Sequence, residues 1–296
     1  MCEPRQESNA SLSRLMIGAE PPALTHREVA TGDVVLRVQG LSLPRTDQFG
    51  VDLAGIDFEV RAGEVVGIAG VSGNGQKELL YSLSGEDRRA APAMVQVAGL
   101  DAGRMSPGQR RALGLHFVPE ERLGRGAVPS MSLAHNLLLT RNDAVGRGGW
   151  LRMDVLHSQA RGIIERYKVK AGGPHSAAKS LSGGNLQKFI VGREIEAKPR
   201  LLIISQPTWG VDVGAAAQIR GEILALRDAG CAVLVLSEEL DELFEISDRL
   251  HVVAKGQLSP SVPRAQATVQ RIGEWMSGLW HAEASAGAQG GSHAQA

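Results

Sequence analysis

The chain has 296 residues, of which 43% are hydrophobic and 22% charged, ordinary values for a globular protein. That length suffices for one large α/β domain or two small ones. Its 32 basic and 32 acidic residues balance, so the composition argues against binding of nucleic acid or a membrane surface through bulk charge. The apolar stretches are shorter than the ~20 residues that span a bilayer. With two cysteines, Cys2 and Cys231, a disulfide framework is excluded, which fits a reducing cytoplasm.

Stretches of strand character alternate with stretches of helical character along the chain. The expected strands are Val34–Val38, Ile56–Val60, Glu64–Gly70, Leu115–Val118, Leu201–Ile204, Ala232–Leu236 and His251–Ala254, the last opening a final strand pair. The expected helices are Gln76–Leu83, Ala216–Arg227 and Leu240–Ile246. This alternation predicts an α/β fold with a mainly parallel core sheet covered on both faces, and the early alternating strands predict an added antiparallel β-layer.

Three further segments differ from this pattern. Residues 120–185 read as a helical insertion or subdomain, because residues 130–180 are rich in helix signals and poor in strand signals. Residues 1–31 are polar and aperiodic, and residues 282–296 are rich in Ala, Gly, Ser and Gln, which predicts a disordered tail. One folded domain is therefore expected over residues 32–281.

A glycine-rich segment follows the apolar strand Glu64–Gly70 and opens a helix. Its glycines are Gly70, Gly73 and Gly75, with Ser72 and Asn74 between them. Strand, glycine-rich loop and helix are the context of a phosphate loop, in which backbone N–H groups and a helix N-terminus converge on an anion. The alternative is a plain glycine-rich turn between a strand and a helix.

The residues after this loop depart from a nucleotide-binding pattern. A phosphate loop continues with a Lys that reaches the phosphates and a hydroxyl that holds Mg²⁺, and here Gln76 and Lys77 stand instead. Lys77 comes one residue late, which turns it ~100° around the helix. An ammonium cannot bind a metal, and Glu78 adds negative charge near the place of the phosphates.

A second candidate anion site begins at Leu181, in the segment Leu181–Gln187 (LSGGNLQ). Ser182 can cap the following helix through its hydroxyl, and Gly183 and Gly184 let backbone N–H groups approach an anion. Apolar residues then follow at helical spacing until Pro199. The alternative is a simple capped helix.

At Leu181–Gln187 the chain resembles the LSGGQ signature of the ABC ATPases, in which Ser182, Gly183, Gly184, Asn185 and Gln187 would contact ATP held by a partner domain. Residues 201–212 (LLIISQPTWGVD) resemble the Walker B strand and the D-loop, including Asp212, and residues 234–258 resemble the switch segment and the closing hairpin. The resemblance covers about residues 32–281 and implies a P-loop NTPase fold.

More narrowly, the chain is similar to the second nucleotide-binding half of sugar and nucleoside import ATPases. The segments 70–79, 118–139 and 205–215 carry that likeness. SRLMIGAE (Ser13–Glu20) echoes RIGEWMSGLW (Arg271–Trp280), so residues 1–31 are interpreted as a linker or the remainder of a preceding domain. This reading leaves open a natural half-subunit and a fragment of a two-domain protein.

Measured against that family, the positions that serve the chain's own ATP are altered. Ser205 and Lys77 occupy the Mg²⁺ positions, so no metal site is expected, and Gln206 replaces the catalytic glutamate. Glu238 replaces the switch histidine and Glu120 the Q-loop glutamine. Hydrolysis by the isolated chain should be very slow or absent, because each lost group is costly in phosphoryl transfer.

The adenine base would need an aromatic residue upstream of the phosphate loop. Phe49 is the candidate, with a loop anchor as its alternative, whereas Phe58 alternates within a strand and reads as core. The resemblance implies ATP as ligand, with Mg²⁺ at the partner's site only.

The first hypothesis for function is the ATP-binding subunit of an importer at the cytoplasmic face of the membrane. Its partners would be an ABC domain with intact Walker motifs, a transmembrane permease and, indirectly, a solute-binding protein. The alternatives are a non-catalytic regulatory or scaffold protein, and an independent ATPase of the repair type, against which Ser205 and Gln206 argue.

Overall fold

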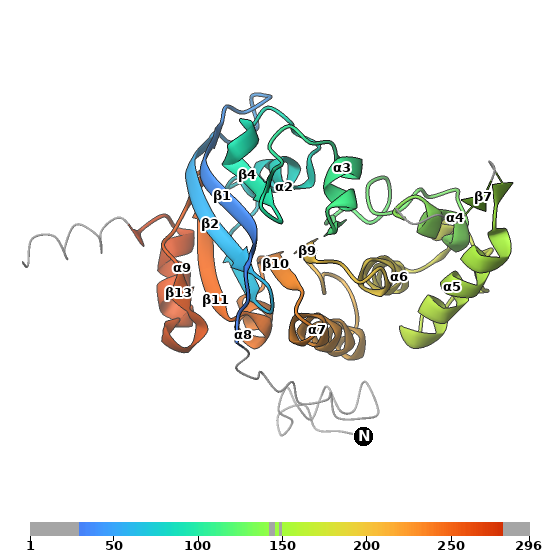
Figure 1. Ribbon diagram of the computed structural model, residues 1–296. Helices are drawn as coiled ribbons and strands as arrows, with labels where there is room; N and C mark the ends of the chain where they lie inside the picture. The colour runs from blue at the N-terminus through green and yellow to red at the C-terminus, as the bar shows by residue number, and fades with distance from the viewer. Residues whose placement is uncertain (1–29, 142–145, 148–149, 281–296) are drawn as a thin grey trace, which may run out of the picture. The chain divides into compact units, whose positions relative to one another are not determined.

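The computed structural model describes residues 30–141, 146–147 and 150–280 (Figure 1). The predictions for residues 1–29 and 281–296, including the Ser13–Glu20 echo and the disordered tail, lie outside these residues. The described chain divides into two compact units. The sheet unit comprises residues 30–117, 200–204 and 229–280, and the helical unit comprises residues 118–199 and 205–228.

The sheet unit contains the strands and short helices on either side of the helical segment. Its first part contains β1 Val34–Leu43, β2 Leu53–Arg61, β3 Val65–Ala69, α2 Gln76–Ser84, η1 Pro92–Met94, β4 Val95–Val97, β5 Leu100–Asp101, α3 Pro107–Ala112 and β6 Leu115–Val118. Its second part contains β9 Leu201–Ser205, β10 Ala232–Ser237, α8 Leu240–Ile246, β11 Arg249–Ala254, β12 Gln257–Leu258, β13 Val262–Pro263, η3 Arg264–Gln266 and α9 Val269–Met276.

Two sheets build this unit. Among the described residues, one sheet has the order β12-β11-β3-β10-β9-β6 with β13 paired to β11, and the other has the order β2-β1-β4-β5. Strand β3 pairs in parallel with both β10 and β11, whereas β1 pairs antiparallel with β2 and with β4. The predicted parallel core and antiparallel β-layer are both confirmed.

Burial explains why these segments are strands. Strands β3, β9 and β10 are buried along their whole length, as expected for apolar runs rich in Val, Ile and Leu that lie inside a covered sheet. Strand β2 alternates between buried and exposed residues, as expected for a layer with one face in the core. Phe58 is 6% exposed and belongs to this core, which confirms its assignment.

The helical unit is built from helices and one short hairpin. Its elements are α4 Leu133–Leu138, β7 Gly146–Arg147, β8 Trp150–Leu151, α5 Met153–Arg166, η2 Ala178–Ser180, α6 Gly183–Glu196 and α7 Val213–Asp228. The expectation of a helix-rich segment is confirmed, but the hairpin of β7 and β8 was not expected because such short strands leave no periodic pattern. The unit extends beyond the predicted insertion at residues 120–185, since it includes all of α6 and α7.

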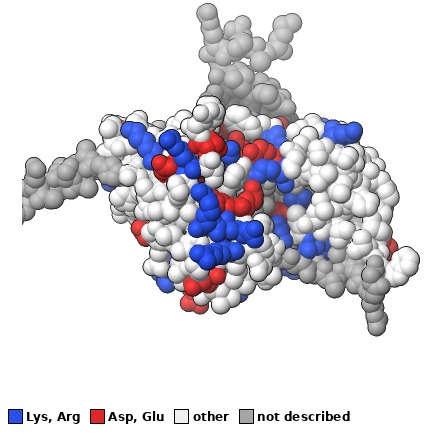
Figure 2. All heavy atoms as spheres, turned by 90° about the horizontal axis from the view of Figure 1, so that it is seen from above, with Lys and Arg blue, Asp and Glu red and all other residues white. Residues whose placement is uncertain are grey.

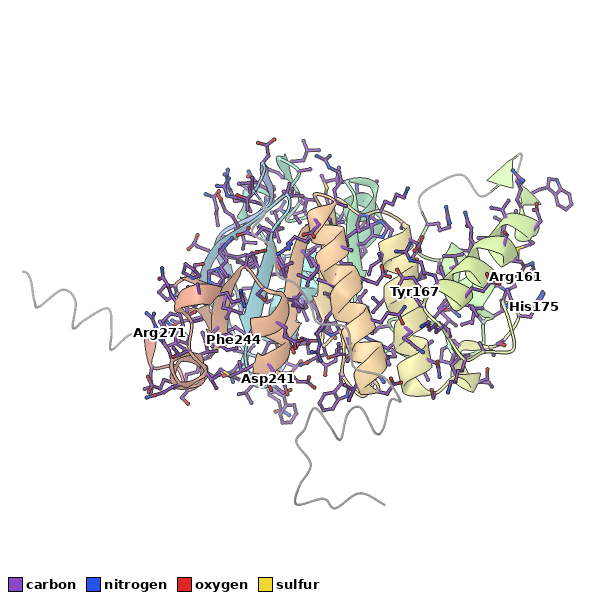
Figure 3. All side chains as sticks on the ribbon, turned by 90° about the horizontal axis from the view of Figure 1, so that it is seen from below. Arg161, Tyr167, His175, Asp241, Phe244 and Arg271 are labelled. Carbon is purple, nitrogen blue, oxygen red and sulfur yellow. The ribbon has the colours of Figure 1, made fainter. Side chains whose placement is uncertain are left out.

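The helical unit has a hydrophobic core of its own. Tyr167, labelled in Figure 3, is fully buried between α5 and α6, and its hydroxyl donates to Oε1 of Glu196 at 3.4 Å. A Cβ atom on Gly192 would lie 2.7 Å from Cδ2 of this ring, so α6 needs a glycine where the ring packs against it. Burial raises the pKa of the Tyr167 hydroxyl above its ordinary value, so the ring stays neutral.

The molecular surface carries both basic and acidic side chains. Figure 2 shows Lys and Arg side chains gathered in a band with Asp and Glu side chains beside it. The presence of both signs agrees with the net charge of zero. Among the described residues, no helix combines the length and the apolar character needed to cross a membrane.

Candidate functional site

The loop after strand β3 has a backbone that requires glycine. Gly73 and Gly75 have φ angles of +84° and +106°, and α2 begins at the next residue. A Cβ atom on Gly75 would lie 3.1 Å from Cα of Gly256, so no side chain fits there. Gly75, at the N-cap position of α2, makes no side-chain cap. The segment is therefore a strand–loop–helix turn of the kind that cradles anions.

The interior of this loop holds the side chain of Gln76. Its Nε2 donates to the carbonyl oxygen of Val71 at 2.7 Å, and its Oε1 accepts a hydrogen bond from the backbone N–H of Asn74 at 3.1 Å. A Cβ atom on Gly70 would lie 2.6 Å from Nε2 of Gln76, so the amide fills the space beside that glycine. A backbone N–H that a phosphate could use is thus bonded within the loop itself.

Asn74 fixes the loop from the other side. Its Nδ2 donates to Val71 O at 3.1 Å, and its Oδ1 accepts from the backbone N–H of Lys255 at 3.0 Å. The N–H of Gly256 donates to the carbonyl oxygen of Asn74 at 2.9 Å. Asn74 therefore acts as a structural tie between the loop and the turn after β11, while Ser72 is exposed.

Neither charged residue at the start of α2 is engaged in the loop. The Nζ atom of Lys77 lies 5.5 Å from the ring centroid of Tyr81, which is one helical turn further along α2. Oε1 of Glu78 accepts from the backbone N–H of Val51 at 3.3 Å and so braces the segment that carries Phe49. The helix has turned both side chains toward other partners, as the one-residue displacement of Lys77 predicts.

Phe49 lies in the loop between β1 and β2. Its side chain is 87% exposed, which does not match the buried ring that a loop anchor would need. The loop is held instead by Asp47, whose Oδ1 accepts from the N–H of Phe49 at 2.8 Å. An exposed ring on a braced loop is available for stacking on a base, and the stacking role stays a prediction.

Two altered positions follow parallel strands of the sheet unit. Ser237 at the end of β10 pairs with Ala69 at the end of β3, so Glu238 and Gly70 leave the sheet side by side. Glu238 is exposed. The position expected for the switch residue is therefore next to the loop, and it carries a carboxylate.

The remaining altered positions are counted with the helical unit. Glu120 is exposed two residues after β6, and Ser205 is buried at the end of β9. Gln206 has a φ of +48°, a left-handed conformation that is uncommon for a residue other than glycine. Pro207 follows it and starts the segment toward Asp212.

The signature helix α6 starts at Gly183 without a side-chain cap. The predicted capping by Ser182 is wrong, because its Oγ accepts from Nδ2 of Asn185 at 2.8 Å instead of from a backbone N–H. Asn185 in turn accepts the N–H of Lys170 at 2.8 Å through Oδ1. The N-cap residue thus makes no side-chain cap hydrogen bond to the first turn of α6, and the positive end of the helix is a candidate anion-binding element.

The first turn of α6 packs on the segment that holds Asp212. A Cβ atom on Gly184 would lie 3.5 Å from Cα of Val211, at ordinary van der Waals contact, so the helix start and this segment are neighbours. Oδ1 of Asp212 accepts from the N–H of Ala215 at 2.9 Å and so supports the first turn of α7. Signature and D-loop segments are therefore direct neighbours within the helical unit.

Gln187, expected to face the nucleotide, is only 1% exposed and bonded inside the unit. Its Nε2 donates to the carbonyl oxygen of Pro207 at 3.0 Å, and its Oε1 accepts from Nε of Arg122 at 3.1 Å. Arg122 lies in the segment 118–139 that carries the family likeness, but nothing in that segment singles out this arginine, so it is not among the expected site residues. Arg122 and Gln187 are 65 residues apart in the sequence, so their contact becomes visible only in the folded structure.

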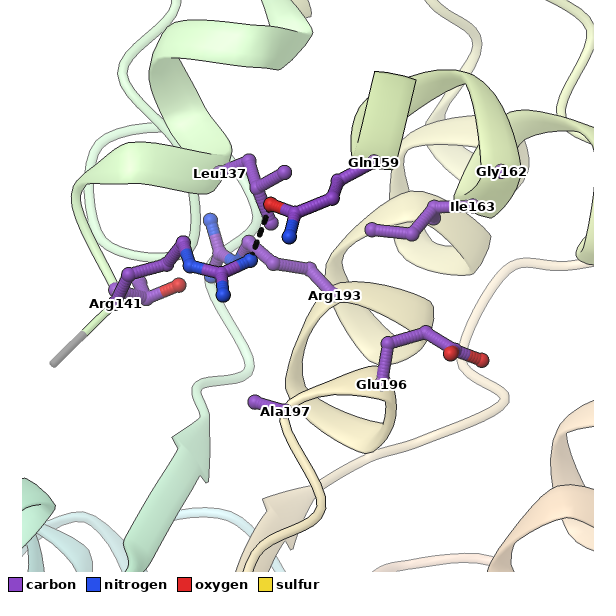
Figure 4. Close-up of a pocket in the computed structure, with 9 residues that line it drawn as sticks. Leu137, Arg141, Gln159, Gly162, Ile163, Arg193, Glu196 and Ala197 are labelled. Carbon is purple, nitrogen blue, oxygen red and sulfur yellow. Dashed lines mark hydrogen bonds between the residues drawn. The ribbon is translucent and has the colours of Figure 1, made fainter. Parts of the chain in front are cut away.

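A separate cavity of about 280 Å³ lies at the other end of α6 (Figure 4). Helices α4, α5 and α6 line it, with polar groups from Arg141, Gln159 and Arg193. Arg141 donates to Oε1 of Gln159, and Nε of Arg193 pairs with Oε1 of Glu194 at 2.8 Å. Because a helix rises about 1.5 Å per residue, the cavity is roughly 15–20 Å along α6 from Gly183 and belongs to no nucleotide-facing segment.

Comparison with known proteins agrees with these loops and helices. Residues 53–209 match the family model described as ABC transporter. The chain belongs to the ABC transporter ATP-binding domains.

Curated ABC relatives extend the match over nearly the whole chain. A glucose import ATP-binding protein of Haloferax volcanii is 42% identical over 95% of this chain and 52% of its own length. A nucleoside import ATP-binding protein of Lactococcus lactis subsp. cremoris is 36% identical over 92% of this chain and 54% of its own length. The chain therefore spans about half the length of these relatives.

Solved ABC cassettes share the fold. The ATP-binding subunit of an ABC transporter superposes with a TM-score of 0.66 at 19% identity, covering 82% of this chain and 99% of that one. A nucleotide-free ATP-binding cassette superposes with a TM-score of 0.63 at 21% identity, covering 78% of this chain and 92% of that one. The expectation of a P-loop NTPase fold of the ABC type is confirmed.

Proposed function

We propose that this chain is the ATP-binding subunit of an importer for sugars or nucleosides and that its signature segment completes an ATP site on a partner domain. The relatives named as glucose, nucleoside and guanosine import ATP-binding proteins support the solute class. By the same resemblance, the proposal puts this subunit at the cytoplasmic face of the membrane, bound to a permease that receives solute from a solute-binding protein.

One contrast between the two candidate anion sites carries the proposal. The start of α6 has glycines at Gly183 and Gly184 and no side-chain cap, whereas the loop before α2 is filled by Gln76. In this family two domains pair head to tail, so the signature serves the partner's ATP and the phosphate loop serves the chain's own. The open site is the one for the partner, and the filled site is the chain's own.

The chemistry of the altered residues points the same way. A carboxylate can accept a proton from water or help hold Mg²⁺, and neither the Gln206 amide nor the Ser205 hydroxyl supplies that charge. ATP and Mg²⁺ are therefore proposed to react at the partner's Walker motifs. Closure of the pair would then be passed to the permease through the helical unit.

The experiment uses the complex formed by the full chain and the companion ABC domain that co-purifies with it from its own cells. We expect Ser182→Arg in this chain to abolish hydrolysis by the complex, because a guanidinium would occupy the anion position beside Gly183. The matched control is Ser180→Arg, at an exposed serine two residues earlier, which should leave the rate unchanged. Hydrolysis is measured as phosphate release with saturating MgATP.

Each result has a defined consequence. An unchanged rate in the Ser182→Arg complex would rule out the role of the signature in trans. Failure of any ABC domain or permease to co-purify, together with no ATP binding by the complex or the chain, would favour a regulatory or scaffold role. Turnover by the isolated chain would revive an independent ATPase.

A further inference from the structure

Arg122 lies in the loop after β6, two residues beyond Glu120, inside the segment 118–139 that carries the family likeness but outside the expected site residues. Its side chain is partly buried, and burial lowers the pKa of its guanidinium without removing its charge at neutral pH. Its Nε donates to Oε1 of Gln187 on the signature helix at 3.1 Å. This is a charged side chain held inside the helical unit by one hydrogen bond to a neutral amide.

The guanidinium lies beside two glycines, Gly183 and Gly210. A Cβ atom on Gly183 would lie 2.6 Å from Nη1 of Arg122, closer than such atoms approach. A Cβ atom on Gly210 would lie 3.4 Å from Nη2. A side chain at position 183 would therefore displace the end of the Arg122 side chain from its present place.

Gln187 carries the contact onward to the loop after β9. Its Nε2 donates to the carbonyl oxygen of Pro207 at 3.0 Å, and the amide is buried. Arg122, Gln187 and Pro207 thus form a chain of two hydrogen bonds. This chain joins the loop after β6, the start of α6 and the segment that leads to Asp212.

Stability does not explain a cation in this place. Among the described residues no carboxylate pairs with Arg122, and its Nη2 is buried without a hydrogen-bond partner. A desolvated charge without a counter-ion costs folding free energy, and an apolar side chain would fill the same volume without that cost. The arginine is therefore better explained by the Gln187 amide that its Nε–H holds in position.

We propose that Arg122 is a positioning residue for the ATP site of the partner domain: through Gln187 it sets the start of the signature helix against the D-loop segment. This inference rests on the proposed function, in which that helix start contacts the partner's ATP. Arg122 itself does not touch the nucleotide. A displacement of about 1 Å at such a contact can lower a rate about 100-fold.

The test compares Arg122→Met, Arg122→Lys, Gln187→Met and the Arg122→Met/Gln187→Met double variant in the complex with the companion domain. We expect Arg122→Met to lower kcat for MgATP about 10- to 100-fold, with KM changed less than about 3-fold because the partner's own phosphate loop holds the ATP. Lys keeps the charge but lacks the Nε–H that bonds to Gln187, so Arg122→Lys should restore little. The double variant should be no slower than the worse single variant, because both changes break one hydrogen-bonded chain.

Arg125→Met is the matched control, since Arg125 lies in the same loop but pairs with Glu121 at 2.6 Å. It should leave kcat and KM unchanged. Circular dichroism and thermal unfolding of each variant establish that the chain is folded at the assay temperature. If Arg122→Met does not fold, Arg122→Lys and Gln187→Met carry the comparison, and a kcat within 2-fold of the unaltered complex in both would overturn the inference.

The outcomes separate the two proposals. A normal kcat in Arg122→Met beside an inactive Ser182→Arg complex would overturn the positioning role and leave the proposed function standing. Additive losses in the double variant would overturn the action through Gln187. An active Ser182→Arg complex would overturn the proposed function, and the inference about Arg122 with it.

Discussion

At the scale of single residues, Gln76 determines what the phosphate loop can offer a ligand. Its side-chain oxygen accepts a hydrogen bond from the Asn74 N–H, and its side-chain nitrogen donates one to the Val71 carbonyl oxygen. These bonds keep polar groups of the loop occupied within the loop itself. A lysine at this position would have no acceptor atom for that N–H and would add a positive charge. The loop could then offer an anion both the free Asn74 N–H and the lysine ammonium.

We therefore expect Gln76→Lys to tighten binding of ATP to the isolated chain by roughly 10-fold or more, the equivalent of one charge-assisted hydrogen bond. Titration of a fluorescent ATP analogue measures the change. Gln270→Lys, at an exposed glutamine on α9, controls for the added charge. Equal affinities for the two variants would show that Gln76 does not limit binding.

His251 is a residue whose environment predicts a response to acid. It is buried in β11, where Nε2 lies 3.1 Å from Nη1 of Arg249 and Nδ1 lies 2.9 Å from the carbonyl oxygen of Ser259. Arginine can only donate, so Nε2 accepts, Nδ1–H donates, and the neutral ring satisfies both contacts. Burial, with Arg249 adding to it, lowers the pKa of His251 from 6.5 to about 4.

The sign of the effect follows from that lowered pKa. Between pH 6.5 and about 4 the unfolded chain binds a proton at this ring and the folded chain does not, so the free energy of unfolding falls as the pH falls through this window. The loss should reach roughly 3 kcal/mol at the acid end. Above pH 6.5 this contribution is constant.

Urea unfolding between pH 7 and pH 4 measures this dependence. Removing the ring with His251→Phe should flatten the curve in that window, whereas His135→Gln, at an exposed histidine, should leave its slope unchanged. If His251→Phe retains the full acid sensitivity, then other groups are responsible for it.

At the scale of elements, α2 shows how a distant residue completes a local structure. Its last turn contains no basic residue. Arg110 of α3 is fully buried and supplies the positive charge, donating to the carbonyl oxygens of Ser82 and Leu83, the latter at 2.6 Å. Burial lowers the pKa of Arg110 to about 10, so it stays protonated at neutral pH. The helix behind the phosphate loop is thus anchored from outside the motif.

The same scale shows what the sequence could predict. Continuous apolar runs located β3, β9 and β10 within about one residue, and Leu115–Val118 and Leu240–Ile246 match β6 and α8. Short elements such as β5, β7, β8 and β13 have two residues each and carry no period. Helix α9 was not expected, although Thr268 caps it by accepting the N–H of Arg271 at 3.2 Å.

In the candidate site, too, some features could be predicted from the sequence and others could not. Glycine positions and altered charges were readable because each is a property of one residue in one motif. The fold of Gln76 into its loop, the Ser182–Asn185 bond and the Arg122–Gln187 bond depend on side-chain directions and on contacts between distant segments. Neither periodicity nor propensity encodes those contacts.

At the scale of the whole molecule, the part of the chain that the structure describes includes separate hydrophobic clusters in the sheet unit and in the helical unit. One gathers residues of β1, β2, β3 and their neighbours, including Ile56, and the other gathers residues of α4, α5 and α6, including Leu156. Each of these side chains is fully buried. A chain with two cores need not unfold in a single transition.

We expect Leu156→Ala to destabilise the helical unit by about 2–5 kcal/mol while leaving the sheet unit protected, and Ile56→Ala to do the reverse. Hydrogen exchange followed by mass spectrometry reads the two units separately, through peptides from residues 153–196 and 34–69. Leu123→Ala, at an exposed leucine, serves as the control. Loss of protection in both units after either core substitution would show that they unfold together.

The closed phosphate loop also affects how this protein should be screened. A ligand raises the unfolding temperature only by binding the folded state, by an amount set by its concentration relative to Kd. A loop whose N–H is already bonded to Gln76 yields a small thermal shift with ATP, whatever the chain does beside a companion domain. A flat thermal-shift profile of the purified chain is thus the expected behaviour of a competent subunit, and ligand discovery should begin with the assembled pair.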